Sequence, residues 1–138
     1  MVKTKRWDDP IEPDDGTRIL VTRYRPRALR KENETWDIWQ RDLGPSAELH
    51  AAFYGKKGEP ISWSTYCAIF HREMRDQKAA IIELARQVAA GSTITLLCSS
   101  ACVRESRCHR SLLRDLILSE VELLKAVAKT LARSVAVA

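Results

Sequence analysis

The chain has 138 residues, 45% of them hydrophobic and 30% charged, which suits one soluble globular domain, residues 1–138, with a core of its own. The formal net charge is only +5, so the distribution of the charges matters more than their sum. The N-terminus carries charges where a secretory signal needs an apolar run, and no apolar run approaches the roughly 20 residues that span a bilayer. We therefore expect no membrane contact and a cytoplasmic location, where the four cysteines are thiols or ligands rather than disulfides.

Two strands are predicted in the first part of the chain. The short segment of residues 2–6 has the alternating pattern of side chains that is typical of an edge strand, and residues 8–16 form a loop rich in proline and aspartate. Residues 18–23 (RILVTR) are typical of a buried strand, because their apolar run is too short for a core helix. Pro26 keeps the preceding residue extended, so Arg23, Arg25 and Arg27 should spread from the carboxyl end of this strand.

Three helices are predicted next, and Asn33, Ser46 and Ser62 each suit the N-cap of one of them. The first helix runs to about residue 43 and packs its two tryptophans in the core. The second stops at the glycine at position 55. The third runs to about residue 90, with a polar step at residues 77–78 in its apolar stripe, and Cys67 on that stripe is expected to be a small core residue.

The last third of the chain predicts a buried strand over residues 94–98 (ITLLC), a loop, and a final helix over about residues 107–134. At 1.5 Å per residue this helix is roughly 40 Å long, which exceeds the width of a domain of this size. Its apolar end, past about Glu120, is therefore expected to pair with a second copy in a homodimer. The elements together predict an α/β fold: a short, largely parallel sheet flanked by helices, with a long C-terminal helix.

Several segments resemble those of a known family: KRWDDPIEPDDGTRILVTRYRPRALRK at the start, then WDIWQRDLGPSAELHAAFYG, and TLLCSS followed by CHRSLL. They are similar to the small bacterial and archaeal family called domain of unknown function 488, the YeaO-like proteins. Members usually carry an aspartate, a tryptophan and a glycine, as in DRLWPRG, where Thr22, Arg25 and Ala28 stand here. The doublet Cys98-Ser99 also replaces the more usual cysteine or alanine with a following acidic residue. The resemblance implies a compact α/β fold and supplies no established activity.

An anion-binding pocket is predicted between the two buried strands. A buried strand that leads through a loop into a helix N-terminus is where α/β proteins place ligands, and that helix end favours negative charge. Guanidinium groups match phosphate or carboxylate in two-point geometry. If the two strands are parallel neighbours, the pocket is built from arginines of both following loops: Arg23, Arg25, Arg27, Arg104 and Arg110. The alternative is that these arginines pair with the acidic residues of the 8–15 loop.

Cys108 and His109 are the candidate catalytic residues. A thiol in the first turn of a helix, between arginines, has a lowered pKa and more thiolate at neutral pH. The side chains of helical neighbours point about 100° apart, so His109 is not automatically the base for Cys108. A nucleophile, a redox sensor and an inert cysteine all fit this pattern.

Two further interpretations, a metal site and a phosphatase-like loop, involve Cys98 and Cys102. Together with Cys108 and His109 they spell C-x3-C-x5-C-H, a full set of soft metal ligands. Adjacent Cys108 and His109 converge poorly on one tetrahedral ion, and Cys98 can point into the core, so neither a metal nor a cofactor is predicted. Cys98 to Arg104 also has the C-x5-R length of a cysteine phosphatase loop, but the segment between them lacks the glycines that such loops need.

The favoured function is binding or processing of a phosphorylated or otherwise anionic metabolite, and the sequence leaves open whether the protein is an enzyme. One alternative is a nucleic-acid-binding module that uses the same arginines, although only Tyr24 supplies an aromatic ring among them. Another alternative is a cysteine-based redox or metal sensor.

Overall fold

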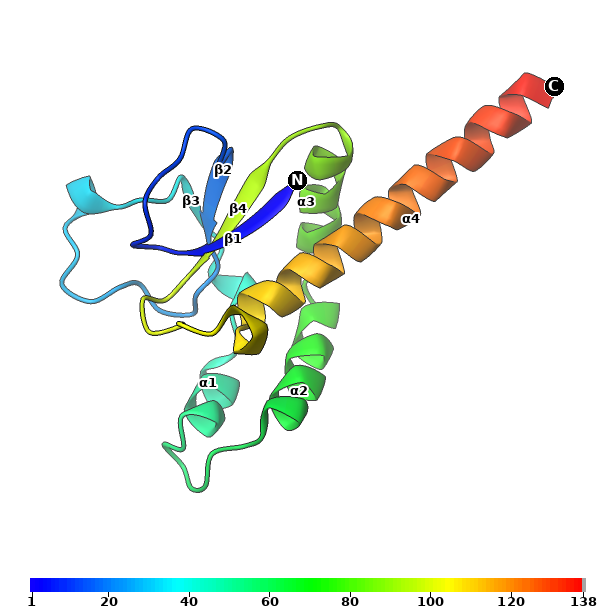
Figure 1. Cartoon of the computed structure of the whole chain (residues 1–138). Helices are drawn as coiled ribbons and strands as arrows, with labels where there is room; N and C mark the ends of the chain where they lie inside the picture. Colours follow the sequence, from blue (N-terminus) through cyan, green and yellow to red (C-terminus); the bar gives the residue numbers. More distant parts are fainter. Residues whose placement is uncertain (138) are drawn as a thin grey trace.

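The computed structural model describes residues 1–137 and shows a four-stranded parallel sheet with helices packed against it (Figure 1). The strands lie in the order β1-β4-β2-β3 and comprise β1 (Val2–Arg6), β2 (Thr17–Leu20), β3 (Ile38–Trp39) and β4 (Ile94–Cys98). The helices are α1 (Ala47–Phe53), α2 (Trp63–Arg75), α3 (Lys78–Ala89) and α4 (His109–Val137), with short 3-10 turns η1 (Lys31–Asn33), η2 (Arg41–Leu43) and η3 (Glu105–Arg107). The predicted α/β fold with a parallel sheet and a long C-terminal helix is confirmed.

Strand β4 is the centre of the sheet. It pairs in parallel with β1, from Val2 opposite Ile94 to Arg6 opposite Cys98, and on its other side with β2. All five of its residues are buried, as expected for a parallel strand covered on both faces. Because the three strands are parallel and in register, their carboxyl ends meet at one edge of the sheet.

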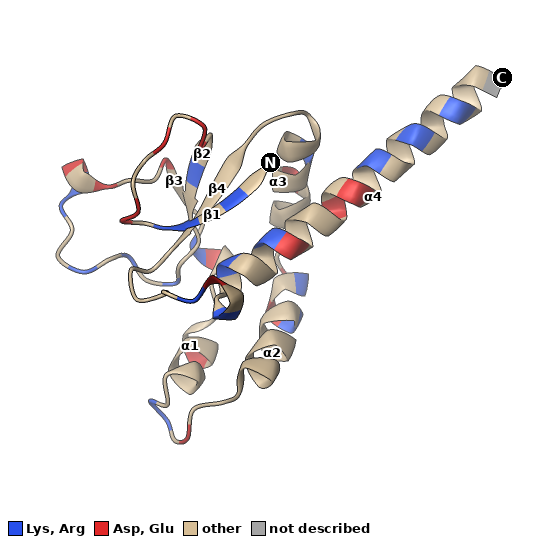
Figure 2. Ribbon diagram, viewed as in Figure 1, with Lys and Arg blue, Asp and Glu red and all other residues tan. Residues whose placement is uncertain are grey.

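The two faces of the sheet have opposite characters, because side chains alternate along each strand. The face toward the helices is apolar: Val2, Ile19, Val21, Ile94 and Leu96 join a core that includes Phe70, Leu84, Leu113 and Ile117. The other face carries Lys3, Lys5 and Arg18, whose side chains all form ion pairs with the buried carboxylate of Asp15. Asp15 belongs to the loop between β1 and β2, where acidic residues gather (red in Figure 2). The acidic loop is therefore fastened to the sheet by ion pairs.

The predicted helix over residues 33–43 is wrong. The middle of this segment is extended and pairs with β2 as β3, where the Asp37 N–H donates to the Arg18 carbonyl (2.8 Å) and the Gln40 N–H donates to the Leu20 carbonyl (2.9 Å), and its end forms only the short turn η2. Trp39 is 37% exposed, so it is not the core residue that the helical periodicity suggested. The free edge of β2 offers these backbone groups partners, and this pairing outweighs a local helical pattern.

The predicted N-caps at Ser46 and Ser62 are confirmed, since their hydroxyls accept hydrogen bonds from the backbone N–H groups of Leu49 and Thr65. The single helix predicted over residues 62–90 is instead two helices, because the chain leaves the helical path at Gln77, at the polar step in the apolar stripe. The strand predicted over residues 18–23 is shorter than expected, and β2 ends at Leu20.

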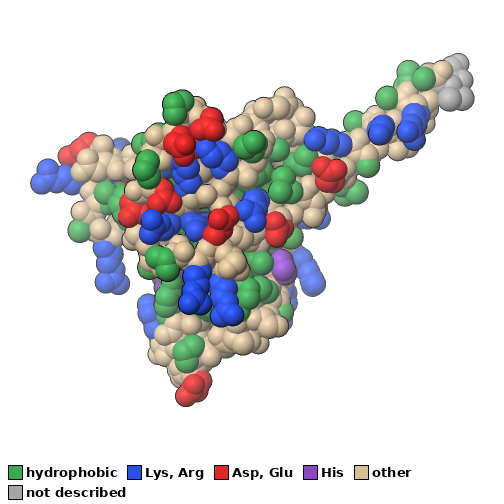
Figure 3. Space-filling model, in the orientation of Figure 1, with side chains coloured by type: hydrophobic (Ala, Val, Ile, Leu, Met, Phe, Trp, Pro, Cys, Tyr) green, Lys and Arg blue, Asp and Glu red, His purple; other side chains and the backbone are tan. Residues whose placement is uncertain are grey.

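Helix α4 begins at His109, packs along α3 and β1, and then projects beyond the rest of the domain (Figure 1). The projecting part exposes a run of apolar side chains, namely Leu123, Val127, Leu131 and Val135, with lysines and arginines among them (Figure 3). Within residues 1–137, no helix combines the length and apolarity needed to cross a bilayer. The homodimer stays a prediction.

Candidate functional site

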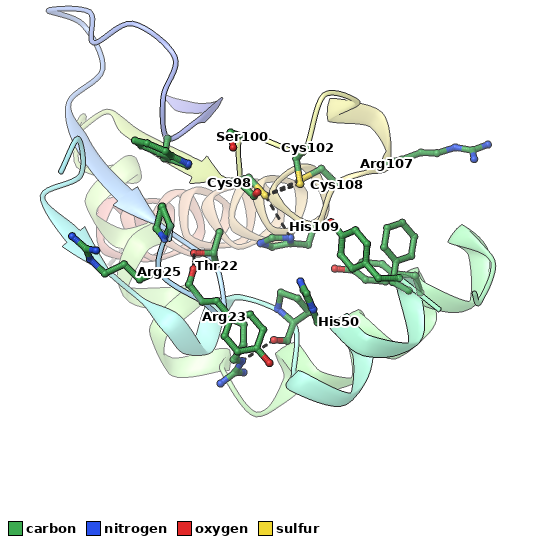
Figure 4. A pocket seen from close by; sticks show the side chains of 18 of the residues that line it. Thr22, Arg23, Arg25, His50, Cys98, Ser100, Cys102, Arg107, Cys108 and His109 are labelled. Atoms are coloured by element: carbon green, nitrogen blue, oxygen red, sulfur yellow. Dashed lines mark hydrogen bonds between the residues drawn. The ribbon is translucent and has the colours of Figure 1, made fainter. Parts of the chain in front are cut away.

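A cavity of about 870 Å³ opens beyond the carboxyl ends of β2 and β4 (Figure 4). Its wall comes from the loops that follow these two strands, from α1 and the turn after it, and from the start of α4. A crevice outside the carboxyl ends of neighbouring parallel strands is the usual ligand position in open α/β sheets. The predicted juxtaposition of the two strands is therefore confirmed by the register of β2 and β4.

Three thiols meet at one side of this cavity (Figure 4). Cys98 ends β4, Cys102 lies in the following loop, and Cys108 stands just before the first residue of α4. The Sγ atoms of Cys102 and Cys108 each lie 3.2 Å from that of Cys98, and all three lie within 4.8 Å of one another. Cys98 and Cys108 are buried and Cys102 is half-buried, so Cys102 is the most accessible of the three.

The three thiols are hydrogen-bonded to one another, and these contacts give them different pKa values. The Cys108 thiol donates to Cys98, and the Cys98 thiol donates to Cys102. The contacts with Cys108 and Cys98 lower the pKa of Cys102, whereas the contact with Cys102 raises the pKa of both Cys98 and Cys108. The sequence-based expectation of a lowered pKa at Cys108 is therefore wrong, because that thiol is enclosed beside another sulfur instead of standing among exposed arginines.

His109 is buried at the base of the thiol cluster. Its Nε2 atom lies 2.7 Å from the Val21 carbonyl oxygen, and its Nδ1 atom lies 3.9 Å from the Sγ atom of Cys98. A carbonyl only accepts, so Nε2 carries the proton and Nδ1 presents its lone pair to Cys98. Burial lowers the pKa of His109 and favours this neutral ring. His109 thus faces Cys98 rather than Cys108, its neighbour in the sequence.

The arginines of the loop after β2 line the cavity, as the sequence predicted for their position. Arg23 donates to the Pro45 carbonyl (2.8 Å), and Arg25 donates to the Leu29 carbonyl and forms an ion pair with Glu34. Arg27 also lines the wall and is exposed. The guanidinium groups of Arg23 and Arg25 are thus held in place by the protein.

The other two predicted arginines are placed differently. Arg104 is exposed and Arg110 is buried, and neither belongs to the cavity wall. Arg110 lies behind the loop, where one nitrogen donates to the Cys102 carbonyl (3.4 Å) while its Nε and Nη1 atoms have no partner among the described residues. Arg107, between them in sequence, does line the wall, and its side chain extends away from the thiols (Figure 4).

The alternative that these arginines pair with the acidic 8–15 loop is not what the structure shows. Asp15 is held by Lys3, Lys5 and Arg18, and Asp9 by Arg6. The arginines of the cavity wall take no part in these pairs. The C-x5-R segment does not form a phosphatase-like loop around the cavity, in agreement with its lack of glycines, because Arg104 is not among the residues of the cavity wall.

Several wall residues come from α1 and the turn that follows it, and sequence reasoning missed them. His50 and Tyr54 pack against each other with ring centroids 4.7 Å apart, and Tyr24 meets His50 edge-on at 5.2 Å. Lys56 adds a positive charge to the wall, and Tyr66 from α2 adds a buried aromatic ring. No local signal marks these residues, since they reach the cavity only through the packing of α1 beside the loop after β2.

The fold and the site together define a small parallel α/β protein with a basic, thiol-containing pocket at the carboxyl edge of its sheet. The chain belongs to the DUF488 family: the family model described as "Active DUF488-N3 subclade" matches residues 2–121. An uncharacterised protein of Mycobacterium tuberculosis is 31% identical over 116 residues, which cover 84% of this chain and 92% of that protein. The uncharacterised protein YeaO of Escherichia coli is 34% identical over 99 residues, 72% of this chain and 83% of YeaO. No solved structure matches the chain.

The family assignment explains one local feature. Ala28 stands where members of the resembled family usually have glycine, and it is the non-glycine residue with positive φ (56°) among residues 1–137. A left-handed backbone suits glycine because it has no Cβ atom. The loop that carries the cavity arginines thus has a glycine-type turn with alanine at its left-handed position.

Proposed function

We propose that the cavity binds a phosphorylated or otherwise anionic metabolite beside the thiol cluster. One observation carries the proposal: the described wall contains five cationic side chains and neither aspartate nor glutamate, the cations being Arg23, Arg25, Arg27, Lys56 and Arg107. Hydrogen bonds to charged groups are roughly twice as strong as neutral ones, and a concave wall of one sign raises the local concentration of counter-ions.

The cations fall into two groups with different roles. Arg23 and Arg25 are already fixed by backbone carbonyls, so they lose little side-chain entropy when an anion binds. Arg27, Lys56 and Arg107 form no ion pair with an acidic residue in residues 1–137, so the charges of Arg27 and Lys56 are available to a ligand, while Arg107, which extends away from the thiols, adds positive charge at the margin of the cavity. The first group would orient the anion and the second would neutralise it.

The volume of the cavity and the aromatic residues of its wall indicate what the part of the ligand outside its anionic group is like. A volume of about 870 Å³ lies within the range of pockets that enclose a metabolite-sized molecule, about 300–1,000 Å³. Tyr24, His50 and Tyr54 form one aromatic cluster in the wall. We therefore expect a ligand that combines an anionic group with a flat or apolar part.

The test is calorimetric titration at low ionic strength with inorganic phosphate, a nucleoside monophosphate, a sugar phosphate and a dicarboxylate. At least one of these should bind, and Arg27→Ala and Lys56→Ala should each weaken its affinity about tenfold, which corresponds to about 1.4 kcal/mol. Arg86→Ala is the matched control, because Arg86 is an exposed arginine on α3 outside the cavity wall.

Two outcomes would overturn the proposal. One is that none of the four anions binds, and the other is that the cavity variants bind as tightly as Arg86→Ala. A mixed oligonucleotide in the same assay separates the nucleic-acid alternative, which would show tight binding that falls steeply as salt rises.

A further inference from the structure

The three thiols of the cavity are arranged as a metal-binding group. Sγ atoms of Cys98, Cys102 and Cys108 lie within 4.8 Å of one another, and no other trio of His, Cys, Asp or Glu side chains in residues 1–137 meets that condition. Cysteine sulfurs on one zinc ion at about 2.3 Å are about 3.8 Å apart in a tetrahedral site. The shortest separations here, 3.2 Å, need to open by only about half an ångström to reach that spacing.

The three sulfurs are held by separate parts of the backbone. Cys98 is fixed at the end of the central strand, where its carbonyl accepts from the Trp7 N–H (2.8 Å). Cys102 is held by a turn in which its N–H donates to the Ser99 carbonyl (3.0 Å), and Cys108 is held where its carbonyl accepts from the Ser111 N–H in the first turn of α4 (3.1 Å). The convergence is thus a product of the fold and not of one flexible loop.

We propose that Cys98, Cys102 and Cys108 bind a soft, zinc-type metal ion through three sulfurs, with a fourth coordination position open to the cavity. All three cysteines line the cavity wall, which leaves that position accessible to a ligand. Three protein ligands with one open position is the arrangement of catalytic zinc sites, whereas structural sites use four. This site goes beyond the proposed anion binding and does not depend on it.

His109 and Arg110 support the site without joining it. His109 has its Nε2 proton on the Val21 carbonyl and turns Nδ1 toward Cys98, but neither ring nitrogen belongs to the set of donors that lie within 4.8 Å of one another. A divalent ion with three thiolates carries one net negative charge. The buried guanidinium of Arg110, which reaches the Cys102 carbonyl, supplies a positive charge behind the loop.

The experiment is a titration of reduced protein with Co²⁺, followed by competition with Zn²⁺. We expect one Co²⁺ per chain, with sulfur-to-metal charge-transfer absorption and the intense visible bands of a tetrahedral ion, all lost when Zn²⁺ is added. Zn²⁺ binding should release protons in weak buffer, because every thiol that is protonated in the metal-free protein gives up its proton when it ligates the ion.

Cys102→Ser is the decisive variant, because Cys102 is half-buried in a loop and its replacement leaves the core unchanged. It should weaken Co²⁺ binding at least a hundredfold and abolish the charge-transfer absorption. Cys67→Ser is the matched control: Cys67 is a half-buried cysteine on α2 outside the group, and its loss should leave the spectrum unchanged. Circular dichroism of both variants checks that the fold is kept.

Three results would overturn the proposal: no Co²⁺ binding to reduced protein, the weak spectrum of a six-coordinate ion, or unchanged binding in Cys102→Ser. The Arg27→Ala variant separates this site from the anion site. It should bind Co²⁺ as the unmodified protein does, so loss of anion binding and loss of metal binding are measured independently.

Discussion

The Nε2 atom of His109 lies 2.7 Å from the carbonyl oxygen of Val21, and this contact joins the end of β2 to the first turn of α4 across 88 positions of sequence. It also accounts for the end of the strand. The Val21 N–H still donates to the Leu97 carbonyl (3.0 Å), as in a sheet, but the Val21 carbonyl accepts from the His109 imidazole instead of from a neighbouring strand. The chain then turns away from the sheet and carries Arg23, Arg25 and Arg27 into the cavity wall.

We predict that His109→Leu lowers the free energy of unfolding by about 1–3 kcal/mol, because it leaves the buried Val21 carbonyl without a partner. His109→Gln should lower the free energy of unfolding by less, since the glutamine amide nitrogen can replace Nε2 as the donor. Urea unfolding of both variants measures the difference. Equal stabilities of the two variants would show that the hydrogen bond contributes nothing.

The parts of the fold that the sequence predicts best are those fixed by local signals. The buried run of residues 94–98 and the caps at Ser46 and Ser62 need no knowledge of distant residues. The segment over residues 33–43 was mistaken because its structure depends on the free edge of β2, a partner that no local pattern reveals.

The site divides in the same way. The arginines after β2 and the cysteines after β4 follow strand ends, so parallel pairing of the two strands was enough to bring them together. The contributions of His50, Tyr54 and Lys56 depend on how α1 packs, and the sequence carries no signal for it. The sequence does not reveal that Arg110 is buried either. A shift of one position along a helix turns a side chain by about 100°, which is enough to move it from a cavity wall to the interior.

The left-handed backbone at Ala28 (φ 56°) predicts a stabilising substitution. Ala28→Gly should raise the free energy of unfolding by about 1 kcal/mol, because the relief of Cβ strain exceeds the entropy cost of glycine. Ala68→Gly, at an exposed position inside α2, is the control and should lower it by about 1 kcal/mol. Urea midpoints of the two variants on opposite sides of the wild type support this account, and a destabilised Ala28→Gly contradicts it.

Asp15 predicts a specific response to acid. Burial works against ionisation of this carboxylate, yet hydrogen bonds from Lys3, Lys5 and Arg18 bring its pKa well below the ordinary value. A lowered pKa means that the unfolded chain binds the proton more readily, so the stabilisation is complete above about pH 4, the unfolded pKa, and is lost as the pH falls toward the folded pKa.

We therefore expect Asp15→Asn to lower the free energy of unfolding by about 3 kcal/mol at pH 7, because it leaves Arg18 buried without its charge partner. The difference from the wild type should shrink as the pH falls below about 4. Asp14→Asn is the matched control, since Asp14 is the exposed neighbour in the same loop, and it should change little. A pH-independent difference between Asp15→Asn and the wild type would argue against the ion-pair explanation.

The projecting part of α4 predicts self-association. The apolar positions Ile117, Val121, Leu124, Ala128, Leu131 and Val135 follow one another in alternating steps of four and three, the spacing of a coiled-coil seam. The seam starts in the core, where Ile117 and Val121 are buried, and continues onto exposed helix, where Leu131 is 62% exposed. Lys129 and Arg133 lie about 120° around the helix from the centre of the seam, and Lys125 flanks it, so no cation stands in the seam itself.

We predict a dimer in sedimentation velocity at micromolar concentration, and a monomer for Leu131→Glu, which places a charge in the seam. Arg133→Glu introduces the same residue two positions away, about 200° around the helix, and should stay dimeric. Circular dichroism should show the same folded domain in both variants. A monomeric wild type would contradict the prediction, and binding of that monomer to anionic vesicles would indicate that a basic amphipathic helix meets a lipid surface instead.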